Sequence, residues 1–144
     1  MLFVKDITVL TTHTSASMKE DSIELAHGIM TWVSVSFPKG CHGLVNCRIF
    51  HREHQIYPSR ANSELRGDGE AIEWAEYYEM YQPPYELLIR SWATGTVYDH
   101  VITVRIAVLP RKAVLALSIA DAIKGMFGAL LPKRIFTAGE KKAE

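Results

Sequence analysis

The sequence predicts a mainly β protein: an antiparallel β-sandwich or jelly roll of about seven or eight strands with a C-terminal amphipathic helix. From Lys5 to Pro110, short segments alternate apolar and polar residues and are separated by glycine, proline and other turn residues. After Pro110 the spacing of apolar residues becomes that of a helix. Many short strands with frequent turns are typical of sandwiches and jelly rolls.

The chain divides into four predicted parts. Residues 1–20 form an extended N-terminal arm or a first strand, and residues 21–110 form the β-sandwich domain. Residues 111–132 form the helix, and residues 133–144 form a polar tail. With 144 residues, the chain is long enough for one domain with a real core and too short for two ordinary ones.

Two runs near the start of the domain predict a hairpin. Residues 22–26 place Ile23 and Leu25 on one face, and His27-Gly28 is a tight-turn candidate. In the second run, from 29 to 37, one face carries Ile29, Thr31, Val33, Val35 and Phe37. We expect these two strands to pair with each other.

The segment from Phe37 to Pro58 contains both cysteines and three of the six histidines. Zinc requires short-spaced ligand pairs, and Cys41 and Cys47 are too far apart to form one. Alternation turns Cys47 inward with its strand neighbours Val45 and Ile49. We therefore predict a turn and a hairpin across residues 52–53, with no metal site; a metal or enzyme site here remains the less favoured alternative.

The second half of the domain contains a long polar loop and three further strands. The loop, residues 59–70, is predicted to be mobile or to bind a partner. Residues 71–82 favour a strand with a bend, and the strands at 85–92 and 100–109 are expected to form another hairpin. In the last strand one face carries Ile102, Val104, Ile106 and Val108.

The terminal helix is the strongest indication of function. Its wide apolar face must be buried against the domain itself, another subunit or a membrane surface. We favour contacts between subunits, because basic residues lie mainly at the two ends of the helix. The expected contact residues are Val114, Leu115, Leu117, Ile119, Ile123, Met126, Phe127 and Leu130.

A carbohydrate-binding or adhesion module is the alternative hypothesis. Aromatic rings can stack on sugars, and residues 66–68 spell the Arg-Gly-Asp tripeptide of some adhesion ligands. The ligand surface on this interpretation comprises Trp74, Tyr77, Tyr81, Trp92 and Asp68. We expect no enzyme activity, no catalytic residue and no cofactor, because the sequence shows no recognisable combination of a base, a nucleophile and groups that would stabilise an oxyanion.

Charge and composition exclude several classes of partner. Sixteen basic residues balance sixteen acidic ones, so nucleic acid is not an expected partner. Asp121 and Lys124 in the middle of the helix argue against a membrane span. The first residues lack the features of a signal peptide, and two cysteines cannot form a disulfide scaffold.

Two phrases carry a resemblance to a known class of proteins: Pro38-x-Gly-Cys-x-Gly-Leu-Val45, and Pro-Pro-Tyr-x-Leu at residues 83–87. With the strand rhythm of residues 22–110, they resemble small β-sandwich accessory proteins of tailed-phage virions, including capsid decoration proteins. The resemblance implies a self-associating, non-enzymatic homo-oligomer, with a trimer as one option, that contacts a capsid or other shell protein. Its location would be the virion if the chain is phage-derived, and otherwise the cytoplasm.

Overall fold

The protein is described here from a computed structural model, which describes residues 1–130, with the side chains of the terminal helix described to Gly128. The chain divides into two compact units. One is Met1–Pro110, and the other begins at Arg111. The first contains all the described strands and the second contains the helix.

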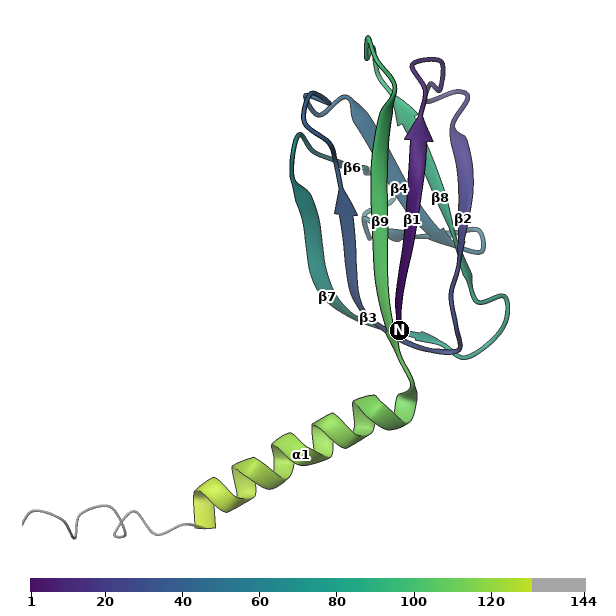
Figure 1. Ribbon diagram of the computed structural model, residues 1–144. Coiled ribbons are helices and arrows are strands. Elements are labelled where there is room, and N and C mark those ends of the chain that lie inside the picture. The colour runs from purple at the N-terminus through teal and green to yellow at the C-terminus, as the bar shows by residue number, and fades with distance from the viewer. Residues whose placement is uncertain (131–144) are drawn as a thin grey trace, which may run out of the picture. The chain divides into compact units, whose positions relative to one another are not determined.

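The first antiparallel sheet has four strands in the order β1-β9-β3-β7 (Figure 1). They are β1 (Leu2–Val9), β9 (His100–Leu109), β3 (Gly28–Ser36) and β7 (Ala71–Met80). Strand β7 forms one edge and β1 the other. This sheet therefore joins both ends of the β unit with segments from its middle.

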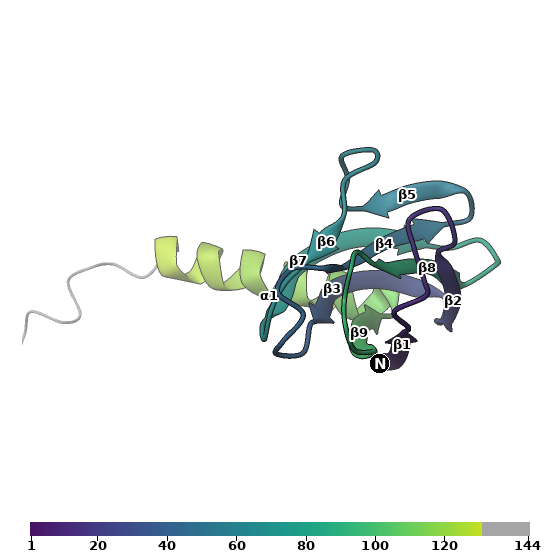
Figure 2. The same ribbon diagram turned by 90° about the horizontal axis from the view of Figure 1, so that it is seen from above.

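The second antiparallel sheet follows the order β2-β8-β4-β5 and forms a second layer (Figure 2). Its strands are β2 (Lys19–Glu24), β8 (Glu86–Ala93), β4 (Val45–His51) and β5 (His54–Tyr57), and the short β6 (Leu65–Arg66) pairs with β4. The prediction of a mainly β protein with antiparallel sheets and a C-terminal helix is thus confirmed.

The pairing of strands differs from two of the predicted hairpins. Strand β2 pairs with β8, whereas β3 pairs with β7 and β9 in the other sheet. Likewise β8 and β9 belong to different sheets. Both hairpin predictions were therefore wrong, because alternation reports which side of a strand is buried but not which strand lies beside it. The hairpin of β4 and β5 is confirmed, with His51 opposite His54.

Both sheets contribute to one hydrophobic core. The first sheet supplies Ile102, Val104, Ile106 and Val108 of β9, and the second supplies Val45, Cys47 and Ile49 of β4. All seven side chains are fully buried. The inward position predicted for Cys47 and its neighbours in β4, and the shared face predicted for β9, are confirmed.

A β-bulge divides the face that was predicted for β3. The pairing register of β3 with both neighbours shifts between Met30 and Trp32. The extra residue reverses the alternation, so Met30 joins the core cluster with Val33 and Val35. Thr31, predicted to share a face with Val33 and Val35, is only half-buried, and its hydroxyl donates to the Ala107 carbonyl at 3.5 Å.

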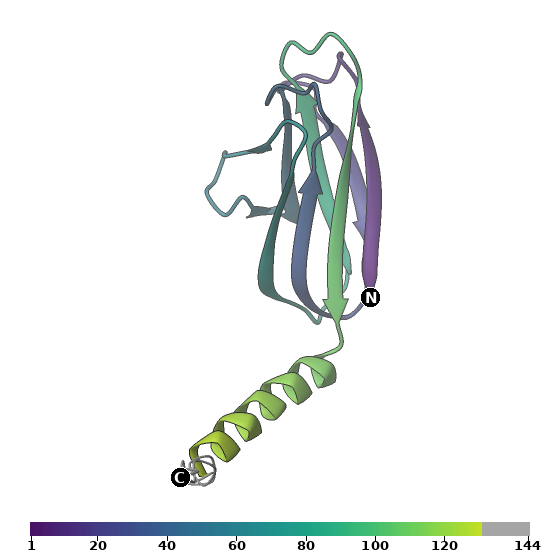
Figure 3. The ribbon, with the colours of Figure 1, turned by 60° about the vertical axis from the view of Figure 1, so that its left-hand side comes forward.

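The N-terminal segment contains a strand rather than an arm. All eight residues of β1 pair with β9, and the two strands run side by side in Figure 3. The Met1 ammonium donates to the Val108 carbonyl at 2.6 Å, and the Val108 amide donates to the Met1 carbonyl at 2.8 Å. Lys19 and Glu20 already belong to β2, so the domain boundary predicted at residue 21 falls within a strand.

The second unit contains α1 (Arg111–Leu130). The predicted end of the helix at residue 132 and the polar tail at 133–144 lie outside the described residues. Within residues 1–130, no helix is both long enough and apolar enough to cross a membrane.

Candidate functional site

Helix α1 exposes large apolar side chains along its whole described length. Their exposed fractions range from 46% for Ile123 to 63% for Met126 and Phe127. The full set is Leu115, Leu117, Ile119, Ile123, Met126 and Phe127. Val114 is half-buried, and the side chain of Leu130, another predicted contact, lies outside the described residues. These residues would remain in water unless something covers them.

Most of these side chains lie on one side of the helix. Successive residues of an α-helix are rotated by about 100°, so positions separated by three or four residues share a side. Leu115, Ile119, Ile123 and Met126 follow each other at spacings of four, four and three residues, and Phe127 adjoins them. We call these five residues the apolar seam.

Leu117 does not belong to the apolar seam. It follows Leu115 by two residues, which rotates it by about 200°, to the far side of the helix. That side also carries Ser118, Asp121 and Lys124. The predicted set of helix contacts is therefore divided between two sides of α1.

The structure does not bring all five residues of the predicted ligand surface together. Trp92 is 5% exposed and lies under the Arg48 guanidinium, whose carbon is 4.8 Å from the ring centroid. Tyr77 is 58% exposed, but it points to the side of β7 opposite Trp74. Trp74 and Tyr81 are half-buried.

Asp68 has a structural role at the far end of β7 from Tyr81. Its carboxylate accepts a hydrogen bond of 2.7 Å from the Gly40 amide and lies 3.4 Å from the His42 ring. The bond from Gly40 is the main reason that the pKa of Asp68 is lowered. The carboxylate of the Arg-Gly-Asp tripeptide is thus engaged in closing the turn at residues 38–43.

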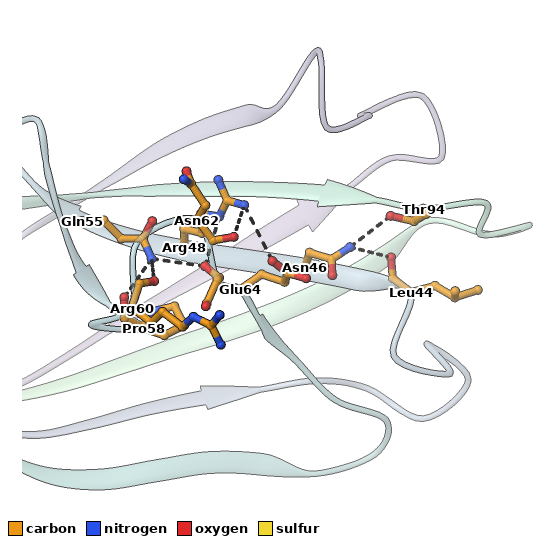
Figure 4. A network of polar contacts seen from close by, with 10 residues as sticks. Leu44, Asn46, Arg48, Gln55, Pro58, Arg60, Asn62, Glu64 and Thr94 are labelled. Carbon is orange, nitrogen blue, oxygen red and sulfur yellow. Dashed lines mark hydrogen bonds and ion pairs between the residues drawn. The ribbon is translucent and has the colours of Figure 1, made fainter.

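The first part of the loop predicted to be mobile or to bind a partner is tied to the second sheet (Figure 4). The Gln55 side-chain amide donates to the carbonyls of Pro58, Arg60 and Ser63 at 2.8–3.1 Å. Arg48 donates to the carbonyls of Asn62 and Ser63 at 2.8 and 3.1 Å. These bonds replace the ladder partners that a loop lacks, so the loop has a defined position.

The cysteine-containing segment has the features of a core element. Cys41 and Cys47 are both free and fully buried. Burial raises the pKa of Cys47 to about 12, and burial together with the negative charge of Asp68 raises the pKa of Cys41. Among the described residues, no group of three or more His, Cys, Asp or Glu side chains could hold a metal ion.

Two aromatic residues outside the predicted surface accompany Trp74. Tyr78 shares the half-buried side of β7 with Trp74, and Tyr57 of β5 packs edge-on against Trp74 with ring centroids 5.0 Å apart. The alternation of Trp74, Glu76 and Tyr78 was the available signal in the sequence for Tyr78. No comparable signal connects Tyr57 to β7, because the two strands lie in different sheets.

No family model, curated protein or solved structure matches this chain. The resemblance to phage accessory proteins therefore stays a prediction.

Proposed function

We propose that this protein is a non-enzymatic structural or assembly protein that associates with copies of itself through α1. The observation that supports this proposal is the apolar seam, whose five large side chains are 46% to 63% exposed. Burying each of them in a contact contributes on the order of 1 kcal/mol. A contiguous apolar surface of this kind marks an interaction site.

A second copy of the helix fits the apolar seam better than a membrane surface does. The spacing of four, four and three residues is that of side chains that interdigitate between packed helices. A helix that lies on a membrane usually has a polar side rich in lysine and arginine. Here Asp121 and Lys124 on the opposite side balance each other.

The β unit would be a jelly roll in this proposal. With the short β6 set aside, each sheet has four strands, and strands adjacent in sequence mostly alternate between the sheets. An order of β1-β9-β3-β7 against β2-β8-β4-β5 corresponds to two Greek keys wrapped together. Shell proteins use this architecture, but lectin domains use it too, so it supports assembly only by analogy. A capsid or other shell partner rests on the sequence resemblance alone.

The proposal is tested by measuring the molar mass of the full chain with light scattering after size-exclusion chromatography. We expect an oligomer for the unchanged protein and a monomer for Ile119→Gln combined with Ile123→Gln. Glutamine is a good helix former, so the helix itself is retained.

Leu117→Gln is the matched control. Leu117 is 60% exposed and Ile119 is 59% exposed, so the control is compared with Ile119→Gln alone, which removes a similar apolar surface and should already lower the molar mass. The control should leave the oligomer intact because Leu117 lies outside the apolar seam. A monomeric unchanged protein, or equal loss of mass in the control, would contradict the proposal. Flotation with lipid vesicles of the monomeric double variant and the unchanged protein would reveal a membrane contact instead.

A further inference from the structure

A pocket of about 570 Å³ lies beside the turn between β4 and β5. One side is formed by the turn residues His51 to His54, and the other by the end of β7 and the residues that follow it, up to Gln82. The two sides therefore come from different sheets. The volume is within the range of about 300–1,000 Å³ that is usual for small-molecule sites.

Aromatic rings in this pocket are fixed by their neighbours. Nδ1 of His51 and the Tyr78 hydroxyl are 2.7 Å apart, which connects β4 of one sheet with β7 of the other. The Tyr81 ring packs against His27, with centroids 5.3 Å apart. Arg52 donates to the Pro83 carbonyl at 3.0 Å, so the guanidinium is also held in place. A ligand would meet preorganised side chains.

A second pocket of about 320 Å³ continues the site along β7. It is lined by Tyr57, Trp74 and Glu76, among others. Glu76 and Tyr78 are two residues apart on the same side of β7, which separates them by roughly 7 Å. The two pockets therefore follow one another beside β5 and β7, which are the edge strands of their sheets.

The lining chemistry selects among ligand classes. Tyr78 and Tyr81 supply aromatic faces, Arg52 and Gln82 supply donors, and the carboxylate of Glu53 accepts hydrogen bonds. An anion would meet the carboxylate of Glu53. A wholly apolar ligand would leave the polar groups of the lining without partners.

We propose that this pocket pair is a binding site for a neutral carbohydrate. The C–H face of a sugar ring packs against an aromatic ring, while its hydroxyl groups both donate and accept hydrogen bonds. The larger pocket holds one end of an oligosaccharide, and the Tyr57 and Trp74 pair contacts the next units. This site is independent of the apolar seam and does not depend on self-association.

Binding is measured by titration calorimetry of the full chain with four tetrasaccharides. Three are neutral, namely maltotetraose, cellotetraose and N-acetylchitotetraose, and the fourth is a sulfated tetrasaccharide from heparin. We expect saturable binding of at least one neutral tetrasaccharide. Binding of none of the neutral compounds, or of the sulfated compound alone, would overturn the proposal.

Tyr81→Ala should weaken that binding on the order of tenfold, because it removes an aromatic face. Tyr77→Ala is the matched control, since Tyr77 lies on the other side of β7, and its affinity should be unchanged. If Tyr81→Ala does not fold, as judged by circular dichroism, Gln82→Ala serves instead; Gln82 is exposed, and its loss should weaken binding several-fold. Equal weakening by Tyr77→Ala, or no weakening by Gln82→Ala, would show that the sugar binds elsewhere.

Discussion

The β unit and α1 use the same kinds of apolar residue in opposite ways. In the β unit, isoleucine, leucine and methionine side chains such as Ile89, Leu87 and Met80 are fully buried. In α1, Leu115, Ile119 and Met126 are between 50% and 63% exposed. The β unit buries such side chains in its own core, whereas the helix leaves them exposed.

Polar groups show the same difference. Loop carbonyls of the β unit accept hydrogen bonds from Gln55 and Arg48, and Asp68 closes a neighbouring turn. In α1, the Ser118 hydroxyl donates a local hydrogen bond to the Val114 carbonyl at 3.1 Å. The β unit satisfies its loops with its own polar side chains, whereas α1 leaves apolar side chains exposed. The exposed side of α1 is therefore the better candidate for an interaction surface.

The largest expected difference is in the free energy of unfolding, when one isoleucine in each unit is truncated to alanine. Ile89→Ala leaves a cavity in the core and should lower the free energy of unfolding by about 2–5 kcal/mol. Ile119→Ala should change it by less than about 0.5 kcal/mol. Urea unfolding followed by tryptophan fluorescence measures this, because Trp32, Trp74 and Trp92 all lie in the β unit.

The comparison between the units would fail if the two alanine variants were equally destabilised. It would also fail if Ile89→Ala cost less than Ile119→Ala. In either case α1 would have to contribute to the stability of the β unit.

A smaller decrease in the free energy of unfolding is expected when the hydrogen bonds from Gln55 to the loop carbonyls are removed. Gln55→Ala removes a donor from three carbonyl groups and should cost about 1–2 kcal/mol, since part of the loss is recovered by water. Hydrogen exchange should become faster at residues 59–64 and stay unchanged in the β strands. His54→Ala, the neighbouring exposed position, is the control and should leave exchange in the loop unchanged. Unaltered exchange in Gln55→Ala would mean that other contacts hold the loop.

Sequence alternation was sufficient to predict which side of several strands is buried. In β4 and β9, a strict period of two identified Cys47 and Val104 as core residues, because each strand has one side against the other sheet. In β3 the same rule was wrong at Thr31, where a bulge adds one residue relative to β9. A bulge has no dependable sequence signal, since it arises from pairing with strands distant in the chain.

The position of the residues in the predicted ligand surface depends on which segments are neighbours in space, and alternation along one strand does not report this. Trp92 is three residues from Ile89 in β8, so alternation places it on the side away from the core. The Arg48 guanidinium nevertheless covers the Trp92 ring. Arg48 is itself held in place by its hydrogen bonds to the carbonyls of Asn62 and Ser63. The pocket beside Tyr78 is formed by strands of two different sheets. Neither feature could be predicted without knowing which segments are neighbours in space.

The smallest predicted effect concerns the turn closed by Asp68. Hydrogen bonds from backbone amides, chiefly that of Gly40, lower the pKa of this carboxyl from 3.8 in the folded protein. The charged form is therefore favoured by folding, and its stabilising effect is complete above the unfolded pKa and lost as the pH falls through the folded pKa. Asp68→Asn should be slightly less stable than the unchanged protein at pH 7, and the difference should disappear in acid. Thermal unfolding of both proteins at pH 7 and in acid measures the difference in stability, with Glu53→Gln in the turn between β4 and β5 as the control. A difference that persists unchanged in acid would show that the charge of Asp68 has no part in holding the turn, and that the β unit closes this loop by packing alone.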